Sequence, residues 1–274
     1  MWLSTPTWPN HPQVFAAAGL PLRSYPYLGE DGGLDLDAVL GVLRGVPAGD
    51  VVVLHGCCHN PTGIDPSAEA WEEIADAVTE AGAVPLLDFA YQGFADGLHE
   101  DAKGLRSLLA REQTMLVASS FSKNFALYDE RVGALSIVGA DPDETAALLS
   151  HAKGVIRANY STPPAHGGEI VAAVLADPRL KDQWTEEVGV MRDRINGNRA
   201  KFVAGLQAAA APGDHDSLLR QRGMFSLLPL GEERVARLRE EHAVYVVGAG
   251  RVNVAGLTEQ NLEPVCRAIA AVSS

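Results

Sequence analysis

The chain is poor in basic residues, in cysteine and in aromatic residues. Its 22 Lys and Arg against 35 Asp and Glu give a formal net charge of −13, which argues against a general nucleic-acid surface, because such a surface needs a basic face. Only three cysteines occur in 274 residues, so no disulfide framework is expected and a reduced, cytoplasmic setting fits best. Any site for an anionic ligand must be a local arrangement of donors.

Long apolar runs are also missing. No run reaches the roughly 20 residues that a membrane-spanning helix needs, so no membrane partner is expected. Residues 1–6 lack a basic region followed by an apolar core, so no signal peptide is expected either. With 47% apolar residues, the chain can build a substantial core, as one large domain or as one large and one small domain.

What the sequence does contain is an alternation of strands and helices. Apolar runs predict strands at residues 51–55, 83–88, 114–119 and 133–138. After the first strand, apolar residues spaced i, i+3, i+4, i+7 predict a helix that begins near Pro66, and another helix is expected over about 143–157. This alternation predicts an α/β fold with a mostly parallel sheet flanked by helices.

The pattern changes after Pro178. A long amphipathic helix is expected from about residue 180 to 210, and a final helix over about 258–272. Shorter strands are expected between these helices, at residues 224–228, 244–247 and 251–254. We interpret this part as a smaller α+β domain that is hinged in the long helix, which gives a large domain 1–190 and a small domain 191–274.

Polar side chains follow three of the predicted strands where each strand ends, at residues 55–60, 88–91 and 120–123. The carboxyl ends of parallel strands form the edge at which such sheets bind ligands. A lysine at the end of a buried strand, as Lys123 is, shifts toward the neutral amine that can form a Schiff base with an aldehyde. Together the three segments predict a site for pyridoxal 5′-phosphate (PLP).

PLP requires from a protein a Schiff-base lysine, an anion that faces the ring nitrogen, and donors for the phosphate. Lys123 is the candidate amine and Asp88 the candidate ring partner, while Tyr91 could place its phenol near the ring oxygen. The candidate phosphate ligands are two hydroxyls and a guanidinium, from Ser120, Ser122 and Arg131.

Taken singly, several of these residues have an ordinary structural explanation. Lys123 could be a surface lysine, and Asp88 could cap a helix or a turn. Arg131 could form a surface pair with the neighbouring Asp129 or Glu130.

Two further residues leave the same choice open. Arg251 lies within an apolar strand and needs an anionic partner, which could be a substrate carboxylate or an internal acid. Trp8 could stack on an aromatic cofactor or lie in the core. The run of histidines and cysteines at 55–59 could suggest a metal, but adjacent ligands cannot readily all turn to one tetrahedral centre, so no metal is expected.

The chain resembles the class I aminotransferases, and specifically their aspartate and aromatic amino-acid branch. The resemblance covers nearly the whole chain in order, and His-Gly-Cys-Cys-His-Asn-Pro-Thr-Gly at 55–63 is similar to bacterial aromatic aminotransferases in particular. The matching stretches are residues 8–11, 55–66, 88–94, 120–133, 157–164, 221–225 and 250–256.

The resemblance implies a PLP-dependent transferase of fold type I and assigns roles to single residues. Lys123 would form the covalent link to the cofactor and shuttle the proton of the substrate. Asp88 would pair with the pyridinium nitrogen, supported by His11. Asn60 and Tyr91 would hydrogen-bond the ring oxygen, and Asn60 would also border the substrate.

The same resemblance implies the remaining contacts and a partner subunit. Trp8 would stack on the ring beside the substrate, and Ser120 and Arg131 would hold the phosphate. Arg251 would bind the substrate α-carboxylate. Arg157 would reach into the neighbouring subunit to bind a distal carboxylate, so a homodimer is implied.

The sequence departs from the family in length and at single positions. The family's chains are longer by about a third, and the additional part precedes the position of Met1 and normally supplies a phosphate-binding turn. Ala126 replaces a usual glycine, and Thr162 replaces a usual asparagine or serine.

Two hypotheses follow from the resemblance and its departures. One is a transaminase that acts on an aromatic or acidic amino acid and a 2-oxo acid such as 2-oxoglutarate; the other is a weakly active remnant that keeps the fold. A further PLP reaction, such as β-elimination or decarboxylation, fits the two substrate arginines less well, and the sequence does not rank aspartate against aromatic donors.

Overall fold

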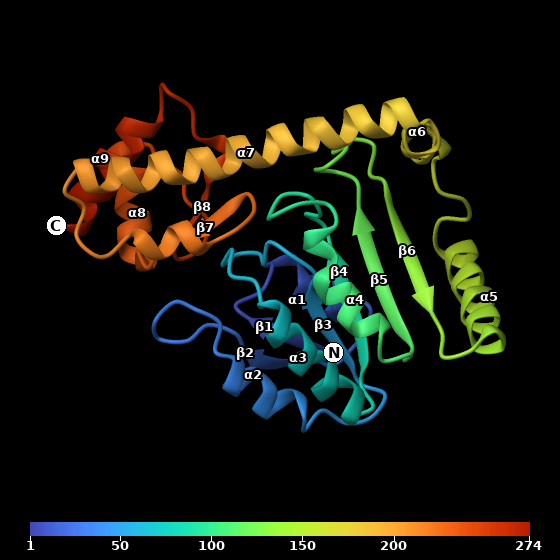
Figure 1. Ribbon diagram of the computed structural model, residues 1–274. Coiled ribbons are helices and arrows are strands. Elements are labelled where there is room, and N and C mark those ends of the chain that lie inside the picture. Colours follow the sequence, from blue (N-terminus) through green and yellow to red (C-terminus); the bar gives the residue numbers. More distant parts are fainter.

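A six-stranded sheet forms the centre of the larger part of the molecule (Figure 1). The computed structural model describes all residues from Met1 to Ser274. The strands are β1 (Trp2–Thr5), β2 (Arg23–Pro26), β3 (Val51–His55), β4 (Val84–Phe89), β5 (Met115–Ser120) and β6 (Gly133–Val138). In the order β2-β1-β3-β4-β5-β6 the first five run parallel, and only β6 is antiparallel to its neighbour. The expected α/β fold with a mostly parallel sheet is confirmed.

Four helices accompany the parallel strands: α1 (Asn10–Ala17), α2 (Leu36–Leu43), α3 (Ala68–Glu80) and α4 (Lys103–Leu109). Ser67 caps α3 by accepting a hydrogen bond from the N–H of Ala70 (3.1 Å). The stripe expected on this helix is buried, with Trp71, Ile74 and Val78 each at most 2% exposed. Burial of that stripe packs α3 against α2, α4 and β4, which fixes the position of the turn that precedes it.

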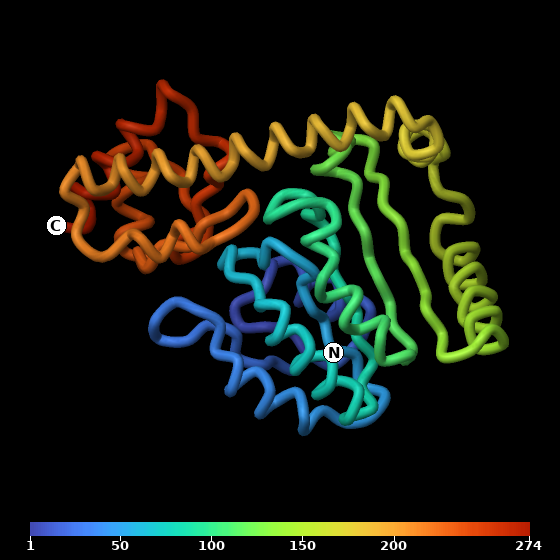
Figure 2. Tube along the Cα trace, viewed as in Figure 1, coloured from blue at the N-terminus to red at the C-terminus, as the bar shows by residue number.

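The chain then leaves the sheet through an outlying pair of helices. β6 leads into α5 (Pro142–Asn159), which buries none of its residues, and then into α6 (Ala165–Ala176). The 31-residue helix α7 (Pro178–Ala208) follows and runs across the molecule from the sheet to the C-terminal part, as Figures 1 and 2 show. The proposed domain boundary at residue 190 falls inside α7, which is unbroken there, so this boundary stays a prediction.

The C-terminal part packs two further helices beside the distal half of α7. Its elements are a short 3₁₀ turn (Asp216–Arg220), β7 (Phe225–Leu227), α8 (Gly231–His242), β8 (Arg251–Asn253), a second 3₁₀ turn (Val254–Gly256) and α9 (Leu262–Ser273). β7 and β8 form a two-stranded antiparallel sheet. Phe202 of α7 is fully buried at the centre of this part.

The prediction of a strand at residues 244–247 is wrong. After α8 ends with Ala243 in a left-handed conformation (φ 53°), the chain has no regular structure, and only Val247 forms an isolated bridge, to Arg251. The apolar side chains of Val244 and Val246 pack on the core instead of pairing with a strand. Separately, none of the helices is long and apolar enough to cross a membrane.

Candidate active site

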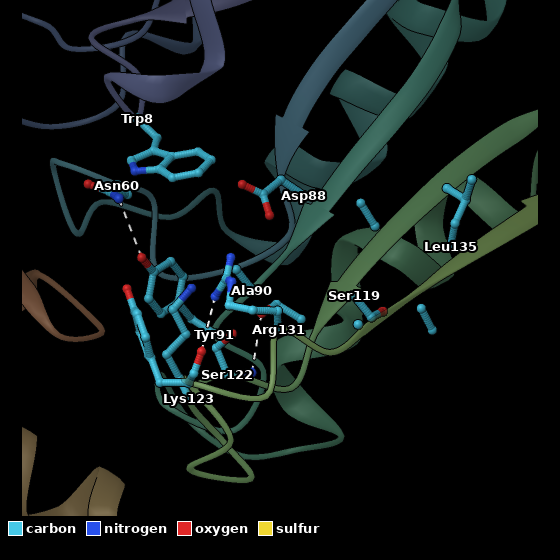
Figure 3. Close-up of a pocket in the computed structure, with 15 residues that line it drawn as sticks. Trp8, Asn60, Asp88, Ala90, Tyr91, Ser119, Ser122, Lys123, Arg131 and Leu135 are labelled. Carbon is cyan, nitrogen blue, oxygen red and sulfur yellow. Dashed lines mark hydrogen bonds between the residues drawn. The ribbon is translucent and has the colours of Figure 1, made fainter. Parts of the chain in front are cut away.

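A cavity of about 370 Å³ opens beside the carboxyl ends of β4 and β5 (Figure 3). Parallel strands bring separate segments of the chain to this edge, since His55 of β3 and Ala118 of β5 lie in register with Asp88 of β4. Eight of the residues singled out from the sequence line the cavity: Trp8, Asn60, Asp88, Tyr91, Ser120, Ser122, Lys123 and Arg131.

Asp88 presents an ionised carboxylate to this cavity. Because a carboxylate only accepts, His11 donates from Nε2 to Asp88 Oδ2 at 3.1 Å, and the other nitrogen of His11 is hydrogen-bonded to the Thr7 hydroxyl at 2.9 Å. Burial alone would raise the pKa of Asp88, but the His11 bond and the nearby His55 and Lys123 outweigh it and hold this pKa below the ordinary value. Oδ1 has no protein partner, so one oxygen of the anion stays available to a ligand.

Lys123 lies half-buried on the opposite side of the cavity. Its Nζ is 4.6 Å from the ring centroid of Tyr91 and 5.8 Å from that of Tyr128. Burial lowers the pKa of Lys123 below its ordinary value, Arg131 lowers it further, and Asp88 partly opposes the change. The amine therefore loses its proton more easily than a fully exposed lysine does, and its half-buried place in the cavity lining differs from that of an ordinary surface lysine.

The loop that carries Lys123 is anchored on both sides. Asn124 donates from Nδ2 to the backbone oxygen of Gln92 (3.2 Å), and its own backbone oxygen accepts from Trp184 Nε1 (2.7 Å) on α7. The ring of Phe125 stacks on that of Trp184 at 4.4 Å. Ala126 adopts a left-handed conformation (φ 54°), which explains why a glycine would suit this position.

Asn60 connects the cavity to the C-terminal part of the molecule. Its Nδ2 donates to the Tyr91 hydroxyl at 3.3 Å, the bond drawn in Figure 3, and its Oδ1 accepts from Arg251 Nη1 at 2.9 Å. Burial and the charge of Asp88 raise the pKa of Tyr91, so its phenol stays protonated at neutral pH. Arg251 lies over the ring of Phe225 (4.4 Å) and pairs with no carboxylate, so the alternative of an internal acidic partner is wrong.

Of three further residues predicted from the sequence, Trp8 and Arg131 line the cavity and Arg157 does not. Trp8 is 38% exposed at the rim of the cavity and meets His11 edge-on at 5.3 Å, so it is not a core residue. Arg131 donates to the backbone oxygen of Tyr128 and forms no pair with its acidic neighbours. Arg157 is exposed on α5, is hydrogen-bonded to Ser161, and does not line the cavity.

The comparisons with known proteins agree with this arrangement. A family model described as aminotransferase class I and II matches residues 1–269. The chain belongs to this family of aminotransferases. The resemblance inferred from the sequence is thereby confirmed.

Among similar proteins, the aspartate aminotransferase of Escherichia coli (strain K12) is 52% identical over 273 residues, which are 99% of this chain and 69% of that protein. An aromatic-amino-acid aminotransferase of Pseudomonas aeruginosa is 48% identical, covering 99% of this chain and 68% of its own length. A solved aromatic-amino-acid aminotransferase from Burkholderia pseudomallei, covalently bound to pyridoxal phosphate, superposes with a TM-score of 0.96 at 47% identity and covers all of this chain and 69% of its own.

The donor set of this aminotransferase fits PLP. The cavity combines a carboxylate with an open oxygen, an amine with a lowered pKa, and the hydroxyl and guanidinium donors of Ser120, Ser122 and Arg131. These are the three kinds of group that the cofactor requires, and all of them come from this one chain. The individual roles of these residues stay predictions.

Two clusters nearby contain metal-binding residue types. The ligand atoms of His11, His55 and Asp88 lie within 4.8 Å of one another, and so do those of Cys57, Cys58 and Asp101. In the second cluster Asp101 accepts hydrogen bonds from four backbone N–H groups, those of Gly93, Ala95, Asp96 and Gly97. Burial also raises the pKa of both thiols, so Cys57 and Cys58 do not readily form the thiolates that bind metals.

Sequence reasoning missed two residues near the cavity. Tyr128 lines it, but an exposed tyrosine in a loop carries no pattern that marks it. Asp65 accepts hydrogen bonds from the backbone N–H groups of Cys58 and His59, in the turn that carries Asn60. Its place in Gly-Ile-Asp-Pro reads simply as part of a turn.

Proposed function

We propose that this protein is a PLP-dependent aminotransferase that moves an amino group between an aromatic or acidic amino acid and a 2-oxo acid such as 2-oxoglutarate. The observation that carries this proposal is the presence of Asp88 and Lys123 in one cavity, the first with a lowered pKa and an open oxygen, the second with a lowered pKa. Membership of the aminotransferase family supports it.

The protein groups around the cavity would hold the cofactor and position the reacting atoms. When bound, PLP supplies an electron sink for the electron pair that remains when the substrate loses its Cα proton. Asp88, oriented by His11, would pair with the ring nitrogen and favour its protonated form. Lys123 Nζ would hold the cofactor covalently until the substrate amine takes its place, and the amine released by that exchange would accept the Cα proton, a role that its lowered pKa favours.

The substrate would be held between the two parts of the molecule. Arg251 has no acidic partner within the protein, so its guanidinium is available to a substrate α-carboxylate, and Asn60 and Phe225 fix its orientation. Trp8 at the rim offers a flat surface for the cofactor ring and borders the substrate. Ser120, Ser122 and Arg131 would bind the phosphate.

We also propose that the protein works as a homodimer in the cytoplasm. Arg157 lies exposed on α5, outside the cavity, where it could reach the cavity of a second copy. β6 and α5 expose the apolar side chains of Leu135 and Val155, 57% and 68% exposed, which a second subunit could cover. Three free cysteines fit a reducing compartment. Sedimentation velocity on the purified protein should give twice the mass of one chain, and a purely monomeric species would contradict this proposal.

The proposed reaction is tested by absorbance of the purified 274-residue protein with PLP, before and after addition of aspartate or phenylalanine. A protein-linked band that disappears as the amino acid is consumed is expected. A band that ignores amino acids would instead indicate the weakly active remnant.

The covalent attachment is tested by Lys123→Ala, which should abolish the protein-linked band. Lys153→Ala, which removes an exposed lysine of α5, is the matched control and should leave the band intact. Persistence of an unchanged band in Lys123→Ala would contradict the assignment of the amine.

A further inference from the structure

The turn that follows β3 is bound at two consecutive peptide groups by one half-buried carboxylate, that of Asp65. Asp65 Oδ2 accepts from the backbone N–H of Cys58 at 2.7 Å, and Oδ1 accepts from the backbone N–H of His59 at 2.9 Å. Both oxygens are thus used on two consecutive peptide groups, six and seven residues back along the chain. These two hydrogen bonds join the end of the turn, Asp65, to its beginning at residues 58 and 59, and so close the loop over residues 58–65.

Within this closed loop, one residue has a backbone conformation that is energetically unfavourable. Cys58 is in the left-handed region (φ 52°), where a side chain with a Cβ is uncommon. Gly63, also left-handed (φ 68°), donates to the backbone oxygen of His59 at 2.7 Å. Because the left-handed conformation of Cys58 is disfavoured locally, the two bonds to Asp65 stabilise the peptide groups on either side of Cys58 in that conformation.

Asn60 follows directly after the two peptide groups that Asp65 binds. It is 3% exposed, and its amide reaches the Tyr91 hydroxyl on one side and Arg251 on the other. Its side-chain position therefore depends on the backbone orientation set at residues 58 and 59. A small rotation there would separate Asn60 from one of its two partners.

The C-terminal part also docks on this turn. Gly63 accepts from the backbone N–H of Arg222 at 2.6 Å, and a Cβ placed on Gly223 would lie 2.4 Å from the Cβ of Cys58. The same turn thus carries the residue that touches Tyr91 in the sheet-containing part and receives the segment that leads to Phe225, beneath Arg251.

We propose that Asp65 is a positioning residue of the aminotransferase site, which fixes the turn at 58–65 so that Asn60 joins Tyr91 to the carboxylate-binding Arg251. The inference rests on the proposed function for the roles of Tyr91 and Arg251. The part played by Asp65 within the turn does not depend on it.

The charges around Asp65 make its ionisation matter. Burial raises the pKa of Asp65 to about 6. The hydrogen bonds from the two backbone N–H groups and the charge of Lys103 lower this pKa, whereas the charge of Asp101 raises it further. The other titratable groups near Asp65 are Tyr27 and the thiols of Cys57 and Cys58. At pH 7 the carboxylate is ionised and offers two acceptors. Below about pH 6 it takes up a proton, and one oxygen becomes a donor that points at a backbone N–H.

The test uses Asp65→Asn, which keeps the shape but has one acceptor and sets its NH₂ against a backbone N–H. Asp35→Asn is the matched control, because Asp35 also accepts a backbone N–H, at the start of α2 (3.0 Å to Ala38), far from the cavity in the sequence and outside its lining. In cofactor-free protein, amide hydrogen exchange at residues 58 and 59 should accelerate at least about tenfold in Asp65→Asn and remain unchanged in Asp35→Asn.

With PLP bound, Asp65→Asn should raise the KM for the amino-acid donor about tenfold, as expected for the loss of about one hydrogen bond at Arg251, with a smaller change in kcat. The KM of the wild type should also rise as the pH falls below about 6, and this rise should be absent from Asp65→Asn. Asp65→Ser, which avoids the facing NH₂ group, should change KM in the same direction and replaces Asp65→Asn if that variant does not fold.

Unchanged exchange at residues 58 and 59 would overturn the inference, and so would faster exchange with KM and kcat both unaltered. Failure of the proposed function is a different result. It would appear as absence of amino-acid conversion by the wild type, while the exchange comparison without cofactor still decides whether Asp65 holds the turn.

Discussion

Acidification should destabilise this protein through a buried neutral histidine, His59. The ring is 1% exposed, stacks on Tyr27 at 3.8 Å, and is hydrogen-bonded to the hydroxyls of Ser4 (3.0 Å) and Thr62 (2.9 Å). Burial lowers the pKa of His59 from the ordinary 6.5 to about 3. Between pH 6.5 and about pH 3, His59 is therefore protonated in the unfolded chain but neutral in the folded protein.

The sign and size of the effect follow from proton linkage. Stability from the neutral ring is complete above pH 6.5 and is lost as the pH falls toward 3. At pH 5 the loss is about 2 kcal/mol, since the unfolded-state pKa then lies about 1.5 units above the pH. Asp65 acts in the opposite sense, because its raised pKa of about 6 makes the folded state gain stability on protonation, by about 1 kcal/mol at pH 5.

Because these contributions partly cancel, the useful quantity is the difference between the wild type and His59→Gln. Urea unfolding of the cofactor-free proteins, followed by tryptophan fluorescence, should give a stability difference that is about 2 kcal/mol smaller at pH 5 than at pH 7. His166→Gln is the control, because that exposed ring pairs with Glu130, which raises its pKa, so acidification should not shrink its difference. A difference for His59→Gln that is the same at both pH values would refute the reasoning.

Two further substitutions test the site and the core. Asp88→Asn removes the anion that faces the cavity, so kcat should fall about a hundredfold while PLP still binds, as measured by steady-state kinetics at saturating PLP; an unchanged kcat would exclude Asp88 as the ring partner. Phe202→Ala empties a fully buried site under α7 and should cost about 3–5 kcal/mol of unfolding free energy in urea titrations, whereas a loss under about 1 kcal/mol would mean that this part of the core is loosely packed.

The elements that the sequence predicted are those that show a pattern by themselves. β3, β4 and β5 are apolar runs, α3 has a regular stripe, and α7 is long enough for its period to be unmistakable. β2 (Arg23–Pro26) was not predicted because it buries only Tyr25, and its strand conformation comes from pairing with β1. The wrong prediction of a strand at 244–247 shows the opposite case. An apolar run there predicts a strand, but a strand forms only beside another strand whose backbone groups are free to pair with it.

The cavity could be located from the sequence because strand ends are visible there and parallel strands bring their ends together. The sequence could not reveal which carboxylate oxygens of the acidic residues in this region are already used to accept hydrogen bonds from the protein. Asp65 uses both on backbone N–H groups, and Asp101 accepts four such bonds. A count of acidic residues treats them as equal charges.

The unused acceptor is what separates Asp88 from these two neighbours. Asp65 and Asp101 bind backbone N–H groups with both oxygens and thereby shape the loops that carry Asn60 and Tyr91. Asp88, which lines the cavity, accepts one bond from His11 at Oδ2 and leaves Oδ1 without a protein partner. An ionised carboxylate with a free acceptor attracts a cationic N–H group, and a protonated ring nitrogen is such a group. Of these three acids, only Asp88 keeps an acceptor free for a ligand, as its proposed role requires, while Asp65 and Asp101 hold the surrounding loops.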